Sequence, residues 1–168
     1  MRRLGRWIGC LAVATTLPGE VHAQDSPVSR WTAMAGIGLL DLGRLNGWAL
    51  GPAAGVHLRL GRHFALGTDV TVLVTSSGFY RFRGGQADLS IALVPRSGTI
   101  EPELGAGVTG VLGSDSDGSI GNAAGLFGGG GVTWWIAPRL GLRGRAAWHI
   151  WHTGVTGAGA SGGVTVRW

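Results

Sequence analysis

The sequence predicts an all-β fold, a closed antiparallel up-and-down barrel of eight transmembrane strands. Apolar and polar residues alternate with a period of two in eight segments that are separated by turn signals. Charged residues make up 14% of the chain, against about 25% in a soluble domain. The 33 glycines are scattered along the sequence, and each would destabilise a long helix. We therefore expect strands whose apolar faces contact lipid.

The first 23 residues are expected to be a secretory signal peptide and to lie outside this fold. Three arginines precede an apolar stretch at residues 7–17, and Val21 and Ala23 provide small side chains before a cleavage site at Gln24. The apolar stretch is shorter than the roughly 20 residues that a membrane-spanning helix needs. Residues 24–168 then form one barrel domain.

The eight expected strands are joined by connections that alternate in length. Short turns are expected at 61–62, 95–98 and 137–138, and long loops at 75–85, 112–122 and 152–160. The first connection is short and contains Asn46-Gly47, a strong hairpin signal. Short turns at one end and long loops at the other are typical of outer-membrane barrels. The expected strands are residues 31–42, 48–60, 63–74, 86–94, 99–111, 123–136, 139–151 and 161–168.

The segment 139–151 indicates which face of each strand meets lipid. Arg143 and Arg145 are two residues apart and must share a face. An arginine facing lipid near the bilayer centre costs about 2–4 kcal/mol, so both are expected to point into the barrel. The same rule, applied to every strand, places both signs of charge inside. The expected interior network comprises Arg59, Asp69, Asp88, Glu101, Glu103, Arg143, Arg145 and Arg167.

An eight-stranded barrel is just wide enough for side chains to fill it, so these charges are expected to form ion pairs in a closed interior. His57 and His149 are expected to fill the same space. Two features fit less well. The first strand alternates poorly around Leu39-Leu40, and Pro52 and Pro102 fall within strands. Since a closed barrel has no free edge for a residue without an N–H group, each proline is expected near a rim or at a bulge.

Tryptophans are expected on the outer face at the two membrane boundaries. The last five residues, VTVRW (164–168), alternate up to an aromatic residue. They resemble the sorting signal of bacterial outer-membrane barrels. The layout of the whole mature chain resembles the small OmpA/OmpX-like outer-membrane β-barrel family. The boundary tryptophans are Trp31, Trp48, Trp134 (or Trp135), Trp148 (or Trp151) and Trp168.

This resemblance implies export by the general secretory route, insertion into the bacterial outer membrane by the barrel-assembly machinery through the C-terminal strand, and no enzymatic activity. We expect a monomer whose partners are outer-membrane lipids and lipopolysaccharide. The net charge of +5 comes from arginine without any basic tail, so we expect no nucleic-acid partner. The expected role is envelope integrity, adhesion or lipid contact through the outer loops.

The sequence offers few candidates for chemistry, and we expect no catalytic residue, cofactor or metal. The stretch 114–122 has aspartates at calcium-ligand spacing, but Leu126 stands where a calcium loop needs its glutamate. Arg81 and Arg83 lie among aromatic residues in an outer loop, where guanidinium groups can bind lipopolysaccharide phosphates.

Three alternatives remain open from the sequence: a lipid A-modifying barrel enzyme, a narrow solute pore and a soluble lipocalin-like barrel. No histidine is followed two residues later by serine, as in the lipid A deacylase pattern, and Ser90 stands alone.

Overall fold

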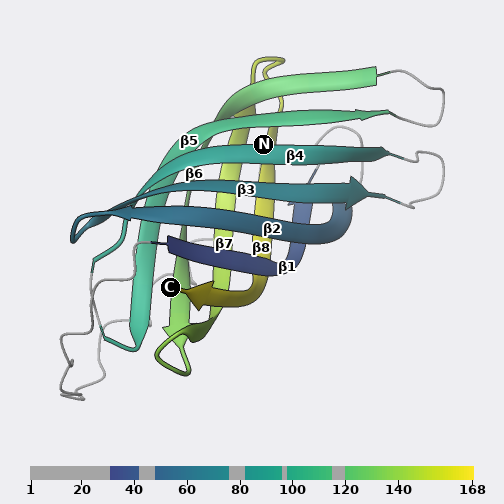
Figure 1. The fold of residues 1–168 in the computed structure, drawn as a ribbon. Coiled ribbons are helices and arrows are strands. Elements are labelled where there is room, and N and C mark those ends of the chain that lie inside the picture. Colours follow the sequence, from purple (N-terminus) through teal and green to yellow (C-terminus); the bar gives the residue numbers. More distant parts are fainter. Residues whose placement is uncertain (1–30, 42–47, 76–81, 96–97, 115–119) are drawn as a thin grey trace, which may run out of the picture.

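A computed structural model describes residues 31–41, 48–75, 82–95, 98–114 and 120–168, and these residues form a closed eight-stranded barrel (Figure 1). The fold class predicted from the sequence is confirmed. The signal-peptide assignment at 1–23 lies outside the described residues, as do the Asn46-Gly47 turn and Arg81. The strands are β1 (Trp31–Asp41), β2 (Trp48–Leu60), β3 (Phe64–Val74), β4 (Arg83–Leu93), β5 (Ile100–Ser114), β6 (Ile120–Trp135), β7 (Leu140–Trp151) and β8 (Thr156–Arg167).

Each strand pairs antiparallel with the next in sequence, and β8 pairs with β1 to close the barrel. The closing pair runs in one register from Thr32 opposite Arg167 to Leu40 opposite Gly159. In Figure 1 the strands β2 to β5 form one wall, and β7 and β8 cross behind it. Closure matters energetically because it leaves no strand edge whose backbone N–H and C=O groups would lack a neighbouring strand.

The strands extend further at the long-loop end than the alternation predicted. β4 begins at Arg83, β5 continues to Ser114, β6 begins at Ile120 and β8 begins at Thr156. The expected loops 75–85, 112–122 and 152–160 are therefore too long as predicted. Most of the added residues are glycine, alanine or polar residues, so they carry little apolar alternation. Their backbones still join the ladders, because pairing needs no apolar side chain.

The two prolines and the irregular first strand all lie within paired strands. Pro102 lies at the short-turn rim, beyond Leu93 where β4 ends, as expected. Pro52 lies inside β2 without a bulge, because the register with β3 is the same on both sides of it. The pairing of β2 with β3 is instead interrupted at Gly51 and Pro52, which accommodates the missing N–H group. At the ambiguous pair in β1, the buried Leu40 points inward and Leu39 does not.

Exposure alternates along the strands, as expected for a wall with two different surroundings. Phe64, Leu89 and Leu104 are among the many large apolar side chains exposed on the outer face, whereas Asp69 and Arg143 are buried. None of the described residues belongs to a helix long and apolar enough to cross a membrane.

Glycine lets the neighbouring strands β8 and β1 approach closely. A Cβ atom on Gly163 would overlap the carbonyl oxygen of Ala35 and lie 2.7 Å from the Cα atom of Gly36. A Cβ atom on Gly144, which faces outward, would meet nothing within 4 Å. Packing therefore requires glycine at position 163 and does not require it at position 144.

Candidate functional site in the barrel interior

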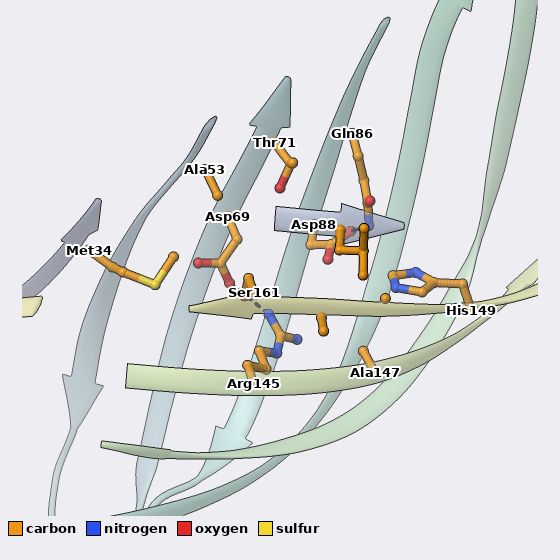
Figure 2. A pocket seen from close by; sticks show the side chains of 13 residues that line it. Met34, Ala53, Asp69, Thr71, Gln86, Asp88, Arg145, Ala147, His149 and Ser161 are labelled. Atoms are coloured by element: carbon orange, nitrogen blue, oxygen red, sulfur yellow. Dashed lines mark hydrogen bonds and ion pairs between the residues drawn. The ribbon is translucent and has the colours of Figure 1, made fainter. Parts of the chain in front are cut away.

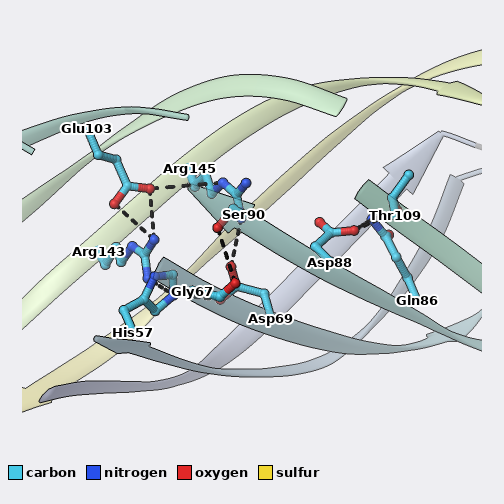
Figure 3. Close-up of polar contacts among 10 residues, drawn as sticks. All are labelled: His57, Gly67, Asp69, Gln86, Asp88, Ser90, Glu103, Thr109, Arg143 and Arg145. Carbon is cyan, nitrogen blue, oxygen red and sulfur yellow. Dashed lines mark hydrogen bonds and ion pairs between the residues drawn. The ribbon is translucent and has the colours of Figure 1, made fainter. Parts of the chain in front are cut away.

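Arg143 of β7 lies at the centre of the charged interior (Figure 3). Its Nη2 atom donates to both carboxylate oxygens of Glu103, at 2.8 and 2.9 Å. Its Nη1 atom lies 2.5 Å from Nε2 of His57. His57 therefore helps hold the arginine that pairs with Glu103.

Arg145, two residues further along β7, links a second carboxylate to the same cluster. Its Nη1 atom lies 2.7 Å from Oδ2 of Asp69, and its Nε atom lies 3.9 Å from Glu103. The guanidinium carbon also lies 4.8 Å from the centre of the Phe127 ring, within the range of a cation–π interaction. Oδ1 of Asp69 lies 3.0 Å from Nε2 of His57. These contacts join β2, β3, β5 and β7 across the interior.

A separate ion-pair cluster lies toward the short-turn end. Arg59 donates to Glu101 at 2.9 Å, and Nη1 of Arg167 lies 3.5 Å from the other oxygen of that carboxylate. Arg167 also donates from Nε to the carbonyl oxygen of Pro138 at 2.7 Å. Its guanidinium carbon lies 4.1 Å from the ring centre of Trp135. These contacts fix the guanidinium group of Arg167 and position β8 next to the turn that precedes β7.

Asp88 differs from the other three interior carboxylates because neutral side chains donate its hydrogen bonds. Its Oδ1 atom accepts from Thr109 at 2.6 Å and from Gln86 at 2.9 Å. Asp88, Arg145 and His149 line a cavity of about 30 Å³ (Figure 2). His149 is buried, and its Nδ1 atom has no hydrogen-bond partner among the described residues. Its ring stacks on Trp151 at 5.4 Å.

Apolar side chains fill the interior at the long-loop end. Leu40, Leu73 and Trp151 are buried there with three further residues, Ala49, Phe82 and Val111. We call these six residues the apolar cap. Alternation did not predict it, because leucines 39 and 40 and residues 72–74 are apolar on both faces of their strands. Gln86 and Thr109, the partners of Asp88, were also missed, since neutral polar residues carry no sign of pairing.

The eight charged residues expected inside, four arginines and four carboxylates, have their side chains in the barrel. Three of the carboxylates pair with arginine, and Asp88 accepts from neutral side chains. Buried charges of this kind are tolerated only when they are paired and hydrogen-bonded, because each loses its hydration. The balanced charges and the apolar cap together fill the interior with side chains.

The outer face carries the residues expected at the membrane boundaries. Trp31, Trp134 and Trp168 are exposed near the short-turn end, and Trp48 and Trp148 are exposed on the same outer face toward the other end. Trp135 and Trp151, the alternatives left open, point inward and are buried. Arg83 is exposed at the start of β4 on the outward side, opposite Val74.

Among the described residues, no cluster of three or more histidine, cysteine, aspartate or glutamate side chains could hold a metal ion. Ser90 is buried, and its hydroxyl donates to the carbonyl oxygen of Gly67 at 3.4 Å.

The strand number, the closed antiparallel order and the reversed polarity of the two faces are those of small eight-stranded outer-membrane β-barrels. The sequence matches no family model and no curated protein. Three solved structures share the fold, and this chain covers almost the whole length of each. Neisserial surface protein A has a TM-score of 0.66 at 18% identity, covering 83% of this chain and 98% of its own.

The N-terminal barrel domain of OprF from Pseudomonas aeruginosa has a TM-score of 0.63 at 9% identity, with the same two coverages of 83% and 98%. Ail, the attachment invasion locus protein of Yersinia pestis, has a TM-score of 0.59 at 8% identity, covering 82% of this chain and 96% of its own. These likenesses establish the fold of the chain.

Proposed function

We propose that this chain is a non-enzymatic integral protein of the bacterial outer membrane, exported by its N-terminal segment, with a sealed interior. One observation carries the proposal: large apolar side chains cover the outside while paired charges fill the inside. This arrangement is stable when hydrocarbon surrounds the barrel, and it is the reverse of a soluble lipocalin-like barrel. OprG, an outer membrane protein of Pseudomonas aeruginosa, has the same fold, which supports the same location.

Fractionation of cells that express the full chain tests the location. We expect the protein in the outer-membrane fraction, and an unheated sample should migrate differently in a denaturing gel from a boiled one, since a folded barrel resists the detergent. Recovery in the soluble fraction without detergent would contradict the proposal and would favour the lipocalin-like alternative.

The filled interior argues against the alternative of a narrow pore. The apolar cap obstructs the long-loop end, and the Arg143–Glu103 pair spans the interior below it. Planar-bilayer recordings of the purified protein should therefore show no discrete conductance steps. Steps that scale with the amount of refolded protein would show that the interior conducts.

The proposed role is contact with the cell envelope or with surfaces outside it, through the long-loop end. Arg83 is exposed on the outer wall at that end, where a guanidinium group can bind a phosphate of lipopolysaccharide. Ail, an attachment invasion locus protein, has the same fold, which supports attachment as one form of this contact. Replacing Arg83→Gln should weaken binding to lipopolysaccharide-containing bicelles, while Arg62→Gln at the opposite end should not.

The lipid A-modifying alternative has a direct test. We expect the mass spectrum of lipid A from a deletion strain to match that of the parent strain. Loss of an acyl-chain modification in the deletion strain, restored by the intact gene, would make the protein an enzyme or an activator of one.

A further inference from the structure

The short-turn end of the barrel exposes arginines and tryptophans along one arc of its rim. Arg139 precedes β7, Trp168 follows β8, Trp31 begins β1, and Arg62 lies in the turn after β2. We call these four residues the basic rim. The backbones of Trp31 and Trp168 exchange hydrogen bonds of 3.4 and 3.2 Å, and the amide of Arg167 donates to the carbonyl oxygen of Arg139 at 3.0 Å. The arc is therefore continuous from β7 to the β2–β3 turn.

The exposed side-chain charge on this arc is positive. Arg62 and Arg139 are both exposed, and neither has an ion-pair partner within the described ranges. The carboxylates described at this end, Glu101 and Glu103, point into the barrel and pair with interior arginines. The interior network therefore neutralises itself and leaves the two rim arginines without a counter-charge from a described acidic side chain.

The aromatic members of the rim place this charge at the depth of lipid headgroups. Trp31 is 43% exposed and Trp168 is 57% exposed, both on the outward face. An exposed indole ring at the edge of an apolar wall prefers the interface between hydrocarbon and water.

We propose that the basic rim binds anionic phospholipid, with the phosphate against Arg62 or Arg139 and the acyl chains along the outer wall of β8 and β1. That wall carries Ala33, Ala35 and Val164 on its outward face. The proposal rests on the proposed function for its orientation, because the short-turn end then faces the phospholipid leaflet of the outer membrane and not the lipopolysaccharide leaflet.

Spin-labelled phospholipids test the proposal on the full mature barrel. The protein is reconstituted into phosphatidylcholine vesicles, and electron paramagnetic resonance measures the motionally restricted fraction of spin-labelled phosphatidylglycerol relative to phosphatidylcholine. An arginine near a membrane surface contributes about 1 kcal/mol to the binding of anionic lipid. We therefore expect the protein to prefer phosphatidylglycerol by roughly two- to fivefold.

Three variants separate this site from general attraction of anions. Arg62→Gln with Arg139→Gln should abolish the preference, and Arg62→Lys with Arg139→Lys should retain it, since only the charge is needed. Arg83→Gln removes one arginine from the opposite end and should leave most of the preference. An equal loss with Arg83→Gln, or a preference unchanged by the double glutamine variant, would overturn the proposal.

A denaturing gel of unheated samples shows whether the barrel has folded. It therefore distinguishes a failure of lipid binding at the basic rim from a failure of the proposed outer-membrane location. A parent protein that inserts and shows the heat-dependent shift, but binds both lipids equally, refutes the basic rim alone. A parent protein that does not insert refutes the proposed location, and with it the orientation on which the rim depends.

Discussion

Replacing Arg143→Met removes the guanidinium group that joins the two halves of the interior cluster. The Arg143 side chain is 5% exposed and makes two hydrogen bonds to Glu103 and one contact with His57. After the change, the nearest cation to Glu103 is Arg145, whose Nε atom lies 3.9 Å away. Methionine fills similar space and cannot neutralise the carboxylate, so a buried charge is left without its partner.

The expected loss in the free energy of unfolding is about 3–5 kcal/mol, the cost of breaking a buried pair from one side. Three separate hydrogen bonds to a charged group would sum to more than this, but Glu103 can draw closer to Arg145 and recover part of the loss. The double replacement Arg143→Met with Glu103→Gln should be more stable than the single variant, because it removes both charges together.

Equilibrium unfolding by urea in lipid vesicles, followed by tryptophan fluorescence and by the gel shift, measures these differences. Arg62→Met is the matched control, since Arg62 is an exposed arginine in a turn, and we expect it to change the unfolding free energy by less than about 1 kcal/mol. If Arg143→Met also cost less than about 1 kcal/mol, the interior would behave as a hydrated surface, and the account of a sealed, charge-paired barrel would be wrong.

Five further substitutions test the wall and the interior separately, each by the same unfolding measurement. Gly163→Ala should destabilise the barrel by more than about 2 kcal/mol, since its Cβ atom would meet the β1 backbone, whereas Gly144→Ala should be neutral or stabilising by about 0.4–1 kcal/mol. His149→Phe should be neutral or slightly stabilising, since Nδ1 has no described hydrogen-bond partner, and His57→Phe should destabilise because it removes the contact to Arg143. Val70→Arg places a charge on the outer face in mid-strand and should lower the free energy of unfolding in vesicles by about 2–4 kcal/mol. If this variant were as stable as the parent protein, the outer face at Val70 would be in contact with water.

The sequence predicts the two faces of this barrel well because the physical penalty is large on both sides. A charge on the outer face or a long apolar side chain in a crowded interior is costly, so period-two alternation assigns each residue without knowledge of its partners. Arg143 and Arg145 could be placed inside on their spacing alone. Leu39-Leu40 was ambiguous because both residues are apolar, and only the observed ladder and burial show that Leu40 points inward.

The partners of the interior charges could not be predicted in the same way. Arg143 and Glu103 lie 40 residues apart, and Arg145 and Asp69 lie 76 apart. Their proximity depends on strand tilt and on how far each strand is displaced along its neighbour when the barrel closes. Alternation predicts whether a side chain points into or out of the barrel, but it does not predict the position of that side chain along the barrel axis. The sequence therefore predicts that the interior charges balance, but not which carboxylate each arginine contacts.

The placement of the pairs makes the interior cooperative. Asp69 contacts His57 and Arg145, Glu103 contacts Arg143 and Arg145, and Arg143 contacts His57. Each group therefore has at least two neighbours that share the cost of its burial, and the loss of one changes the surroundings of all the others. Effects of two substitutions within this cluster should not add, whereas a substitution here and one in the Arg59–Glu101 cluster should be more nearly additive. A barrel with this interior keeps its strands in one register because a displaced strand would separate every pair that its own side chains make.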